Sequence, residues 1–292
     1  MKSLPLEQYV KLFRPEKLAN IKSYLYPPKT WPRACEVVAM DMGGTNFRIA
    51  RVCFDNQGNA SIKDFKKFAM PGVVNRITSD EFFDFFNQMK KDYQAKDVGL
   101  CFSYPAEILE DGRARIITFS KEIKIEGAEN KVLDAYVVND TTAAQLGTKG
   151  ANMGMILGTG FNICYSQGDM IINSEAGRCI DFPTEEFDFG ALSEMQIGGA
   201  YLNPLIEKGL ATKDEIYERG AKIVAAEIYG LAKYAGIDEI RIAIEGSVFY
   251  NVTKLQELIK SNLDQLGAKY IFLDGRDKTL IGAAMATLIE RR

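Results

Sequence analysis

The chain has 292 residues, of which 47% are hydrophobic and 26% are charged, and its formal net charge is −3. This length and composition predict a globular protein with about two domains or lobes, and the charge gives no reason to expect nucleic acid or an anionic membrane as the main partner. No apolar run approaches the roughly 20 residues of a membrane span, and the N-terminus shows no signal-peptide core. We therefore expect a soluble, cytoplasmic protein.

The sequence contains no histidine, and its five cysteines form no Cys-x-x-Cys pair. The missing imidazole excludes His-based catalytic triads and metal sites that contain His. A general base must therefore be a carboxylate or, less often, a Lys, Tyr or Cys side chain. Several cysteines lie in apolar, strand-like segments, which favours small buried thiols over disulfides.

Residues 1–33 are predicted to form an N-terminal helical segment, because apolar residues recur at helical spacing before and after Pro15. The following segment predicts a β-meander. Residues 35–44 and 47–55 form two strands around a Gly-Gly turn, and a third strand lies around 60–68.

The rest of the chain alternates between helices and strands. Capping-box patterns at Thr78–Glu81 and Thr212–Glu215 start two helices, the second running to about Tyr234. Further helices are predicted at 141–147, 251–266 and 280–290, and further strands at 98–105, 132–138, 239–246 and 270–275. From Met155, a second hairpin surrounds another glycine-rich turn.

Both halves thus begin with a hairpin around a glycine-rich turn and continue with alternating elements. This predicts two α/β lobes with a cleft between them, a small lobe at 34–138 and a large lobe at 139–292. One option is that the final helix, about residues 279–292, packs back on the small lobe.

The first glycine-rich turn is Asp41-Met42-Gly43-Gly44-Thr45-Asn46-Phe47-Arg48. Glycines let backbone N–H groups approach phosphate oxygens, and the Thr and Asn side chains add neutral donors. Asp41 is suited to hold Mg²⁺, directly or through water. Gly-Gly alone would be a plain hairpin turn more often than a site, but the longer pattern favours phosphate binding. It is not a Walker A loop.

Two further segments carry polar residues at strand ends. Gly158-Thr159-Gly160 is a weak signal by itself, but together with the first turn it supplies a second donor loop for one triphosphate. In VVNDTTAAQ, residues 137–145, a buried strand passes into a helix, so Asn139 and Asp140 are most simply helix-capping residues.

Eight segments, in order, resemble motifs of the hexokinase family within the actin-like ATPase superfamily. They are the first turn, Phe102-Ser103-Tyr104-Pro105, Phe119-Ser120-Lys121, Asn139-Asp140-Thr141, Gly158-Thr159-Gly160-Phe161-Asn162, residues 172–177, residues 193–202 and residues 244–249. The resemblance spans roughly residues 20–290, and its ordered set is far more specific than any one match.

The resemblance implies an α/β, two-lobed ribonuclease-H-like (actin-like ATPase) fold with the active site in the interlobe cleft. It implies a short, bacterial-type hexokinase or glucokinase that transfers the γ-phosphate of MgATP to the 6-hydroxyl of a hexose, with glucose as the first candidate. Asp140 would be the general base, and Lys121 would stabilise charge on the transferring phosphoryl group.

The resemblance also assigns the binding residues. Those expected to contact the sugar are Ser103, Ser120, Lys121, Asn139, Asp140, Asn162, Glu175 and Glu194. Those expected to contact ATP are Asp41, Gly43, Gly44, Thr45, Asn46, Arg48, Gly158, Thr159, Gly160, Gly246 and Ser247, with Asp41 near Mg²⁺ through water. In isolation, Glu175 and Glu194 would more often be solvated surface acids.

The chain departs from the family in places. It is much shorter than the common eukaryotic hexokinase unit, Ser120 replaces a Thr, Ala176 replaces a Trp after the sugar-binding Glu, and the His-Pro after the adenosine motif is absent. A kinase of fructose, mannose or an amino sugar therefore stays open.

Other protein classes also stay open for the whole chain. A sugar kinase of the ROK type would typically have a zinc site of His and Cys, which this sequence cannot provide. A catalytically silent sugar sensor would be expected to lose the base or a phosphate turn. An actin-like or chaperone-like ATPase would lack the sugar-binding set. A homodimer is an open possibility for the assembly.

Overall fold

The computed structural model describes residues 3–119, 123–183, 192–209 and 211–289. Within these ranges the chain divides into two compact units, each built from separate stretches. Unit 1 comprises Met1–Ile21, Gly150–Gly168 and Ile172–Arg276, and unit 2 comprises Lys22–Lys149, Asp169–Ile171 and Asp277–Arg292. The predicted lobe limits at 34–138 and 139–292 stay a prediction.

Unit 2 is built around a five-stranded sheet with the order β11-β6-β2-β3-β4. These strands are β2 (Cys35–Gly43), β3 (Asn46–Phe54), β4 (Ala60–Ala69), β6 (Val98–Phe102) and β11 (Tyr136–Val138). The three strands from β2 to β4 form an antiparallel meander, whereas β6 runs parallel to both β2 and β11. The predicted meander around the Gly-Gly turn is therefore confirmed.

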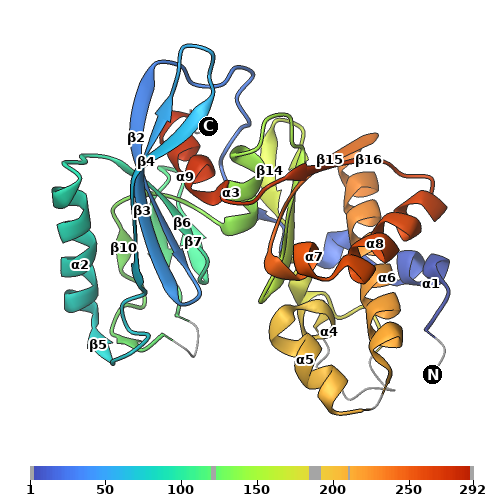
Figure 1. Cartoon of the computed structure of the whole chain (residues 1–292). Helices are drawn as coiled ribbons and strands as arrows, with labels where there is room; N and C mark the ends of the chain where they lie inside the picture. The colour runs from blue at the N-terminus through green and yellow to red at the C-terminus, as the bar shows by residue number, and fades with distance from the viewer. Residues whose placement is uncertain (1–2, 120–122, 184–191, 210, 290–292) are drawn as a thin grey trace. The chain divides into compact units, whose positions relative to one another are not determined.

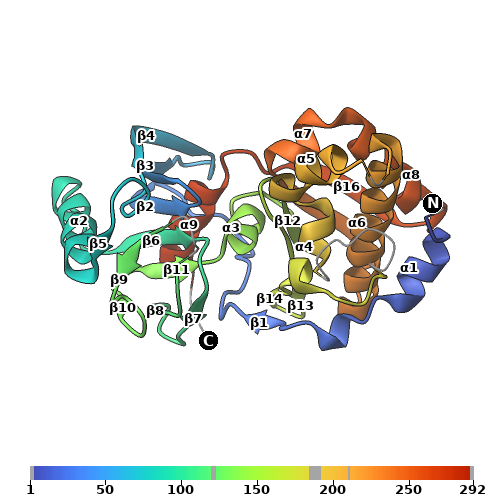
Figure 2. The ribbon, with the colours of Figure 1, turned by 90° about the horizontal axis from the view of Figure 1, so that it is seen from below.

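Helices cover both faces of this sheet, with α2 on one face and α3 and α9 on the other (Figure 2). The helices are α2 (Ser79–Asp92), α3 (Asp140–Leu146) and α9 (Thr279–Leu288). Side chains alternate along β2, so Met40 and Met42 join the core on the side of Phe82 from α2. Asp41 points to the opposite face, where it meets Thr279 of α9.

Two small sheets extend unit 2. One has the order β10-β8-β7, from β7 (Ala106–Ile108), β8 (Ala114–Ile116) and β10 (Val132–Leu133), and the other pairs β5 (Ile77–Thr78) with β9 (Ile125–Glu126). The single strand predicted over 132–138 is wrong, because Val132 and Leu133 pair with β8 whereas Tyr136–Val138 pair with β6. The chain changes sheets between them.

A six-stranded sheet with the order β1-β14-β13-β12-β15-β16 forms the centre of unit 1. Its strands are β1 (Ile21–Lys22), β12 (Met153–Leu157), β13 (Phe161–Gln167), β14 (Met170–Asn173), β15 (Glu239–Glu245) and β16 (Lys269–Asp274). The hairpin of β12 and β13 encloses Gly158–Gly160, as predicted. The two strands beyond it, β15 and β16, continue the sheet in parallel from β12.

The helices of unit 1 are α1 (Leu6–Leu12), α4 (Ser193–Ile197), α5 (Gly199–Glu207), α6 (Lys213–Ala235), α7 (Ser247–Asn251) and α8 (Thr253–Gln265), with 3₁₀ turns η1 (Pro15–Lys17) and η2 (Ala176–Arg178). Helices α6 and α8 lie side by side next to the sheet (Figure 1). The predicted capping boxes are confirmed at the starts of α2 and α6. Among the described residues, no helix combines the length and apolarity that a membrane crossing demands.

Two predicted helical regions match the structure but differ from it in detail. The predicted N-terminal helical segment contains α1, and beyond it Asn20 and Tyr24 adopt positive φ while the N–H of Ser23 donates to the carbonyl of Ile171. The helix predicted over 251–266 is confirmed as α8, and the short helix α7 precedes it, separated from it by Val252, which has a non-helical backbone. The expected thiols are confirmed: none of the five cysteines forms a disulfide, and Cys101, Cys164 and Cys179 are buried.

Candidate active site

The first glycine-rich turn joins β2 to β3 in unit 2. Gly43 pairs with Asn46 across the hairpin, and Gly44 has a φ of +43°, a left-handed conformation that suits glycine. Gly44 and Thr45 are exposed, and the Asn46 amide donates to the Thr45 hydroxyl over 3.3 Å. The Tyr104 hydroxyl donates to the Gly44 carbonyl over 2.7 Å. The turn is thus an exposed loop, and the Tyr104 hydrogen bond fixes the position of its Gly44 carbonyl.

Asp41 lies at the end of β2 and is 7% exposed. Its Oδ2 atom accepts from the Thr279 hydroxyl over 3.1 Å and from Arg48 over 3.3 Å. Burial raises the pKa of Asp41, and the Arg48 charge and the Thr279 hydrogen bond oppose that rise. Sequence reasoning missed Thr279, which has no motif and lies 238 residues further along the chain.

The donors around Asp41 allow a test of the predicted magnesium contact. Oδ2 is already committed and the Cys101 thiol also hydrogen-bonds the carboxylate, whereas Oδ1 lies beside Gly43, 3.5 Å from the position that a Cβ there would take. The described residues contain no cluster of three or more acidic or Cys side chains able to hold a metal. One carboxylate oxygen suits a hydrated Mg²⁺, which usually keeps several of its waters.

Ser103 and the strand end at Asp140 complete the candidate residues of unit 2. The N–H of Ser103 donates to the Met42 carbonyl over 3.1 Å, and its Oγ lies 3.5 Å from the Cβ position on Gly43. Asn139 is the N-cap of α3, because its side chain accepts from the N–H of Thr141 over 3.0 Å. Asp140 is the first residue of the helix and is partly exposed. Its Oδ1 accepts from the same N–H over 2.8 Å, so Asp140 shares the local cap.

In unit 1, the second glycine-rich turn packs against the predicted adenosine motif. The N–H of Gly158 donates to the carbonyl of Gly160 over 3.0 Å, which closes the turn. A Cβ on Gly158 would lie 3.3 Å from Cα of Gly246, whose φ of +120° only glycine adopts readily. The structure therefore brings Gly158, Thr159 and Gly160 together with Gly246 and with Ser247, which begins α7.

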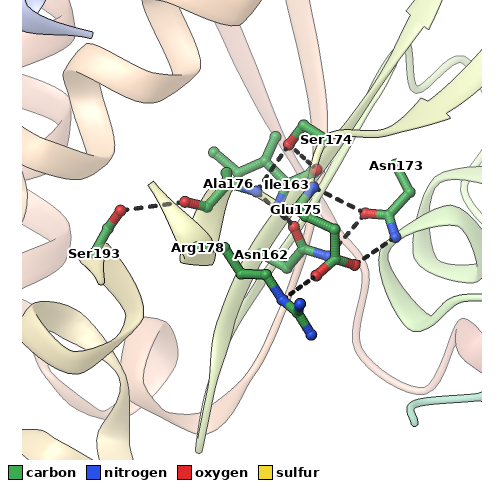
Figure 3. Close-up of polar contacts among 8 residues, drawn as sticks. All are labelled: Asn162, Ile163, Asn173, Ser174, Glu175, Ala176, Arg178 and Ser193. Atoms are coloured by element: carbon green, nitrogen blue, oxygen red, sulfur yellow. Dashed lines mark hydrogen bonds and ion pairs between the residues drawn. The ribbon is translucent and has the colours of Figure 1, made fainter. Parts of the chain in front are cut away.

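A polar network in unit 1 joins predicted sugar-binding residues (Figure 3). The Asn162 amide donates to Oδ1 of Asn173 over 2.9 Å, and the Asn173 amide donates to Oε1 of Glu175 over 2.8 Å. Arg178 reaches the other oxygen of Glu175, with Nε 3.2 Å from Oε2. The carboxylate is thus held from both sides. Asn173 and Arg178 lie within three residues of Glu175 but were not predicted as site residues.

Glu194 lies in the first turn of α4 and its carboxylate meets the second glycine-rich turn. A Cβ on Gly160 would overlap Oε1 of Glu194, so a larger residue at this position would displace the Glu194 carboxylate. Burial raises the pKa of Glu194 and the nearby Glu175 adds to the rise, whereas the N–H of Phe161 and the Arg178 charge oppose it. Neither Glu175 nor Glu194 is an exposed surface acid.

The structure therefore assembles two groups of predicted residues. Unit 2 holds Asp41, Arg48, Ser103 and the first turn, with Asn139 and Asp140 at the start of α3, and unit 1 holds Asn162, Glu175 and Glu194 near the second turn. The predicted Ser120 and Lys121 lie outside the described residues.

Comparison with known proteins gives the same family from two parts of the chain. Models of the family described as hexokinase match residues 11–149 and 211–289. Hexokinase-1 of Arabidopsis thaliana is 24% identical over 78% of this chain and 73% of its own length.

Solved structures agree in fold. A hexokinase from Schistosoma mansoni, solved in complex with glucose, superposes with a TM-score of 0.75 at 16% identity, covering 97% of this chain and 95% of that one. A ROK hexokinase from Thermus thermophilus gives a TM-score of 0.61 at 15% identity, covering 86% of this chain and 97% of that one.

The fold is thus that of the actin-like ATPases, as predicted, and two family models cover most of the sequence. The family transfers phosphoryl groups to the hydroxyls of hexoses. The chain belongs to the hexokinase family and is a phosphotransferase with an alcohol group as acceptor.

Proposed function

We propose that the protein transfers the γ-phosphoryl group of MgATP to the 6-hydroxyl of a hexose, with glucose as the first candidate and Asp140 as the general base. The observation that carries this proposal is the network that holds Glu175 through Asn173 and Arg178, next to the half-buried Glu194. Carboxylates fixed in this way accept paired hydroxyls in defined directions, which is what a sugar offers. The glucose complex of the Schistosoma mansoni relative supports the choice of substrate.

Asp140 suits the role of base for two reasons. It lies at the strand-to-helix junction, partly exposed, with one carboxylate oxygen accepting a backbone N–H that holds the side chain in place. With no histidine anywhere in the chain, a carboxylate is also the most available group for proton transfer. An ionised Asp at neutral pH needs only to lie within hydrogen-bond reach of the attacking hydroxyl.

The two glycine-rich turns would hold the phosphates through their backbone N–H groups. Asp41 would hold Mg²⁺ through water with Oδ1, because Oδ2 already accepts from Arg48 and Thr279. When bound, the ion would neutralise charge on the phosphoryl oxygens. Gly246 and Ser247 would lie against the adenosine. Together these contacts would position the donor, the main requirement of phosphoryl transfer.

A panel of hexoses in a coupled assay with MgATP tests the proposal. We expect turnover with at least one hexose, and a loss of about 10²- to 10⁴-fold in kcat for Asp140→Asn and Asp140→Ala, since general-base catalysis contributes on that order. Asp169→Asn, at an exposed position, is the matched control and should retain full activity. Turnover with no hexose, or full activity in both Asp140 variants, would refute the proposal.

The same panel separates the alternatives. Ala176 stands where the family resemblance leads one to expect Trp, next to the predicted sugar-binding Glu175, so the edge of the sugar site would differ from that of the common hexokinases. A preference for fructose, mannose or an amino sugar would keep the mechanism and change only the substrate. Hexose binding without turnover would instead identify a sugar sensor.

A further inference from the structure

Glu227 lies in the middle of α6 and is fully buried, which is rare for a Glu side chain. Its Oε1 atom lies 2.7 Å from Oγ of Ser193, which is also fully buried. Its other oxygen, Oε2, has no hydrogen-bond partner among the residues that the structure describes. No step of the proposed reaction uses this pair.

Ser193 stands at the centre of a small hydrogen-bond network. Its Oγ lies 3.2 Å from the carbonyl oxygen of Ala176 and 3.3 Å from that of Cys179, and its N–H donates to the Cys179 carbonyl over 2.8 Å. A hydroxyl has one proton to donate, so it cannot serve both carbonyls and an ionised carboxylate at once.

A neutral Glu227 would resolve this competition. Burial raises the pKa of Glu227 well above its ordinary value, and the nearby Asp181 adds to the rise, while the Ser193 hydrogen bond opposes it. A protonated Glu227 would donate to Oγ of Ser193, which would leave the Ser193 proton for a carbonyl of the η2 segment.

The network connects three segments that lie far apart in the sequence. Ala176 directly follows Glu175, and Ser193 directly precedes Glu194. We propose that Glu227 is a positioning residue for the hexose site. Through its contact with Ser193, it keeps the segments that carry Glu175 and Glu194 in fixed positions relative to each other. This inference rests on the proposed function.

Energetics separate this role from a purely structural one. A buried acid with an unsatisfied oxygen is a poor source of stability, and an apolar side chain of similar volume in its place is often neutral or stabilising. A structural role alone therefore predicts that Glu227→Leu leaves the site unchanged. A positioning role predicts weaker hexose binding, because small displacements of binding groups have large effects on the reaction.

The experiment compares Glu227→Leu, Glu227→Gln and Ser193→Ala with the unchanged protein, with Glu218→Gln at an exposed position of α6 as the control. We expect Glu227→Leu and Ser193→Ala to raise the KM for the hexose about tenfold, the effect of losing one hydrogen bond to a positioned group. The KM for MgATP should change less than about twofold. Glu227→Gln retains a donor and should keep the hexose KM within about threefold.

Calorimetric titration with the hexose alone makes the inference independent of turnover. If the unchanged protein binds a hexose but phosphorylates none, the proposed function fails and the affinities of the variants still decide the inference. An unchanged hexose affinity in Glu227→Leu would overturn it. Should that variant fail to fold by circular dichroism, an unchanged affinity in Ser193→Ala would do the same.

Discussion

Glu194 shows how the surroundings of one residue set its chemistry. Its sequence context is that of an ordinary helical Glu, yet its carboxylate is half-buried against Gly160 and close to Glu175. Burial disfavours the charged form, so the pKa of Glu194 is raised. This has a consequence for the pH dependence of the reaction.

We predict that kcat/KM for the hexose falls as the pH falls through the raised pKa of Glu194, at a higher pH than an ordinary Glu would cause. The protonated acid can no longer accept two hydroxyl hydrogen bonds. Glu194→Gln should lower kcat/KM at neutral pH about 10- to 100-fold, since hydrogen bonds to charged groups contribute about 1.5–3 kcal/mol, and should abolish this acid limb.

The measurement is a pH–rate profile at limiting hexose and saturating MgATP. Glu207→Gln, an exposed position at the end of α5, provides a control that should keep the profile of the unchanged protein. An acid limb that remains at the same pH in Glu194→Gln would contradict the assignment, whereas a limb that moves to lower pH would be that of Asp140.

Close backbone contact explains how α9 packs in unit 2. A Cβ on Gly282 would overlap the carbonyl oxygen of Ala143 in α3, and a Cβ on Gly99 would overlap that of Ala283 in α9. These two glycines let the helix approach both α3 and β6. The approach also brings Thr279 to Asp41 at the first glycine-rich turn.

We predict that Gly282→Ala destabilises the protein by roughly 1–3 kcal/mol, the usual cost of overpacking. The sign of the change in the free energy of unfolding distinguishes close packing from open space, because Gly→Ala in an unhindered helix would stabilise the protein by about 1 kcal/mol. Urea unfolding followed by circular dichroism measures the difference. Thr287→Ala, on the same helix but half-buried, should shift the free energy of unfolding by much less.

The start of α6 offers a second test at this scale. The Thr212 hydroxyl accepts from the N–H of Glu215 over 3.3 Å, and the Glu215 carboxylate accepts from the N–H of Thr212 over 2.8 Å. We predict a loss of about 1 kcal/mol in the free energy of unfolding for Thr212→Ala and almost none for Thr212→Ser, which retains the cap. Equal losses in both variants would show that the methyl group matters instead.

Across the whole molecule, the five cysteine thiols differ in burial. Cys101, Cys164 and Cys179 are buried, whereas Cys35 and Cys53 are partly exposed. Burial raises the pKa of both Cys35 and Cys53, which lowers their thiolate fraction and slows their reaction.

A thiol titration with Ellman's reagent tests this arrangement. We predict that only Cys35 and Cys53 react in the native protein, slowly at neutral pH, and that all five cysteines react after unfolding in guanidinium chloride. The midpoint of thermal unfolding should be the same with and without a reductant, because no disulfide contributes to stability. Rapid reaction of all five thiols under native conditions would contradict the described packing.

Much of the fold follows from patterns between close neighbours in the sequence. The capping boxes at Thr78 and Thr212 depend on residues three positions apart, and the hairpins around the two glycine-rich turns depend on residues 3 to 19 positions apart. Local backbone preferences and side-chain caps decide such features, so they can be predicted from sequence. The ordered motifs likewise predicted the family.

Tertiary structure alone decided what surrounds these motifs. Thr279 reaches Asp41 across 238 residues, and Glu227 reaches Ser193 across 34. No local signal marks either contact, since each depends on how a helix packs against distant segments, and this also determines burial and therefore the pKa of Glu194 and Glu227. The sequence by itself determined which residues are available for hexokinase chemistry. Packing determined which of them are buried, held and paired.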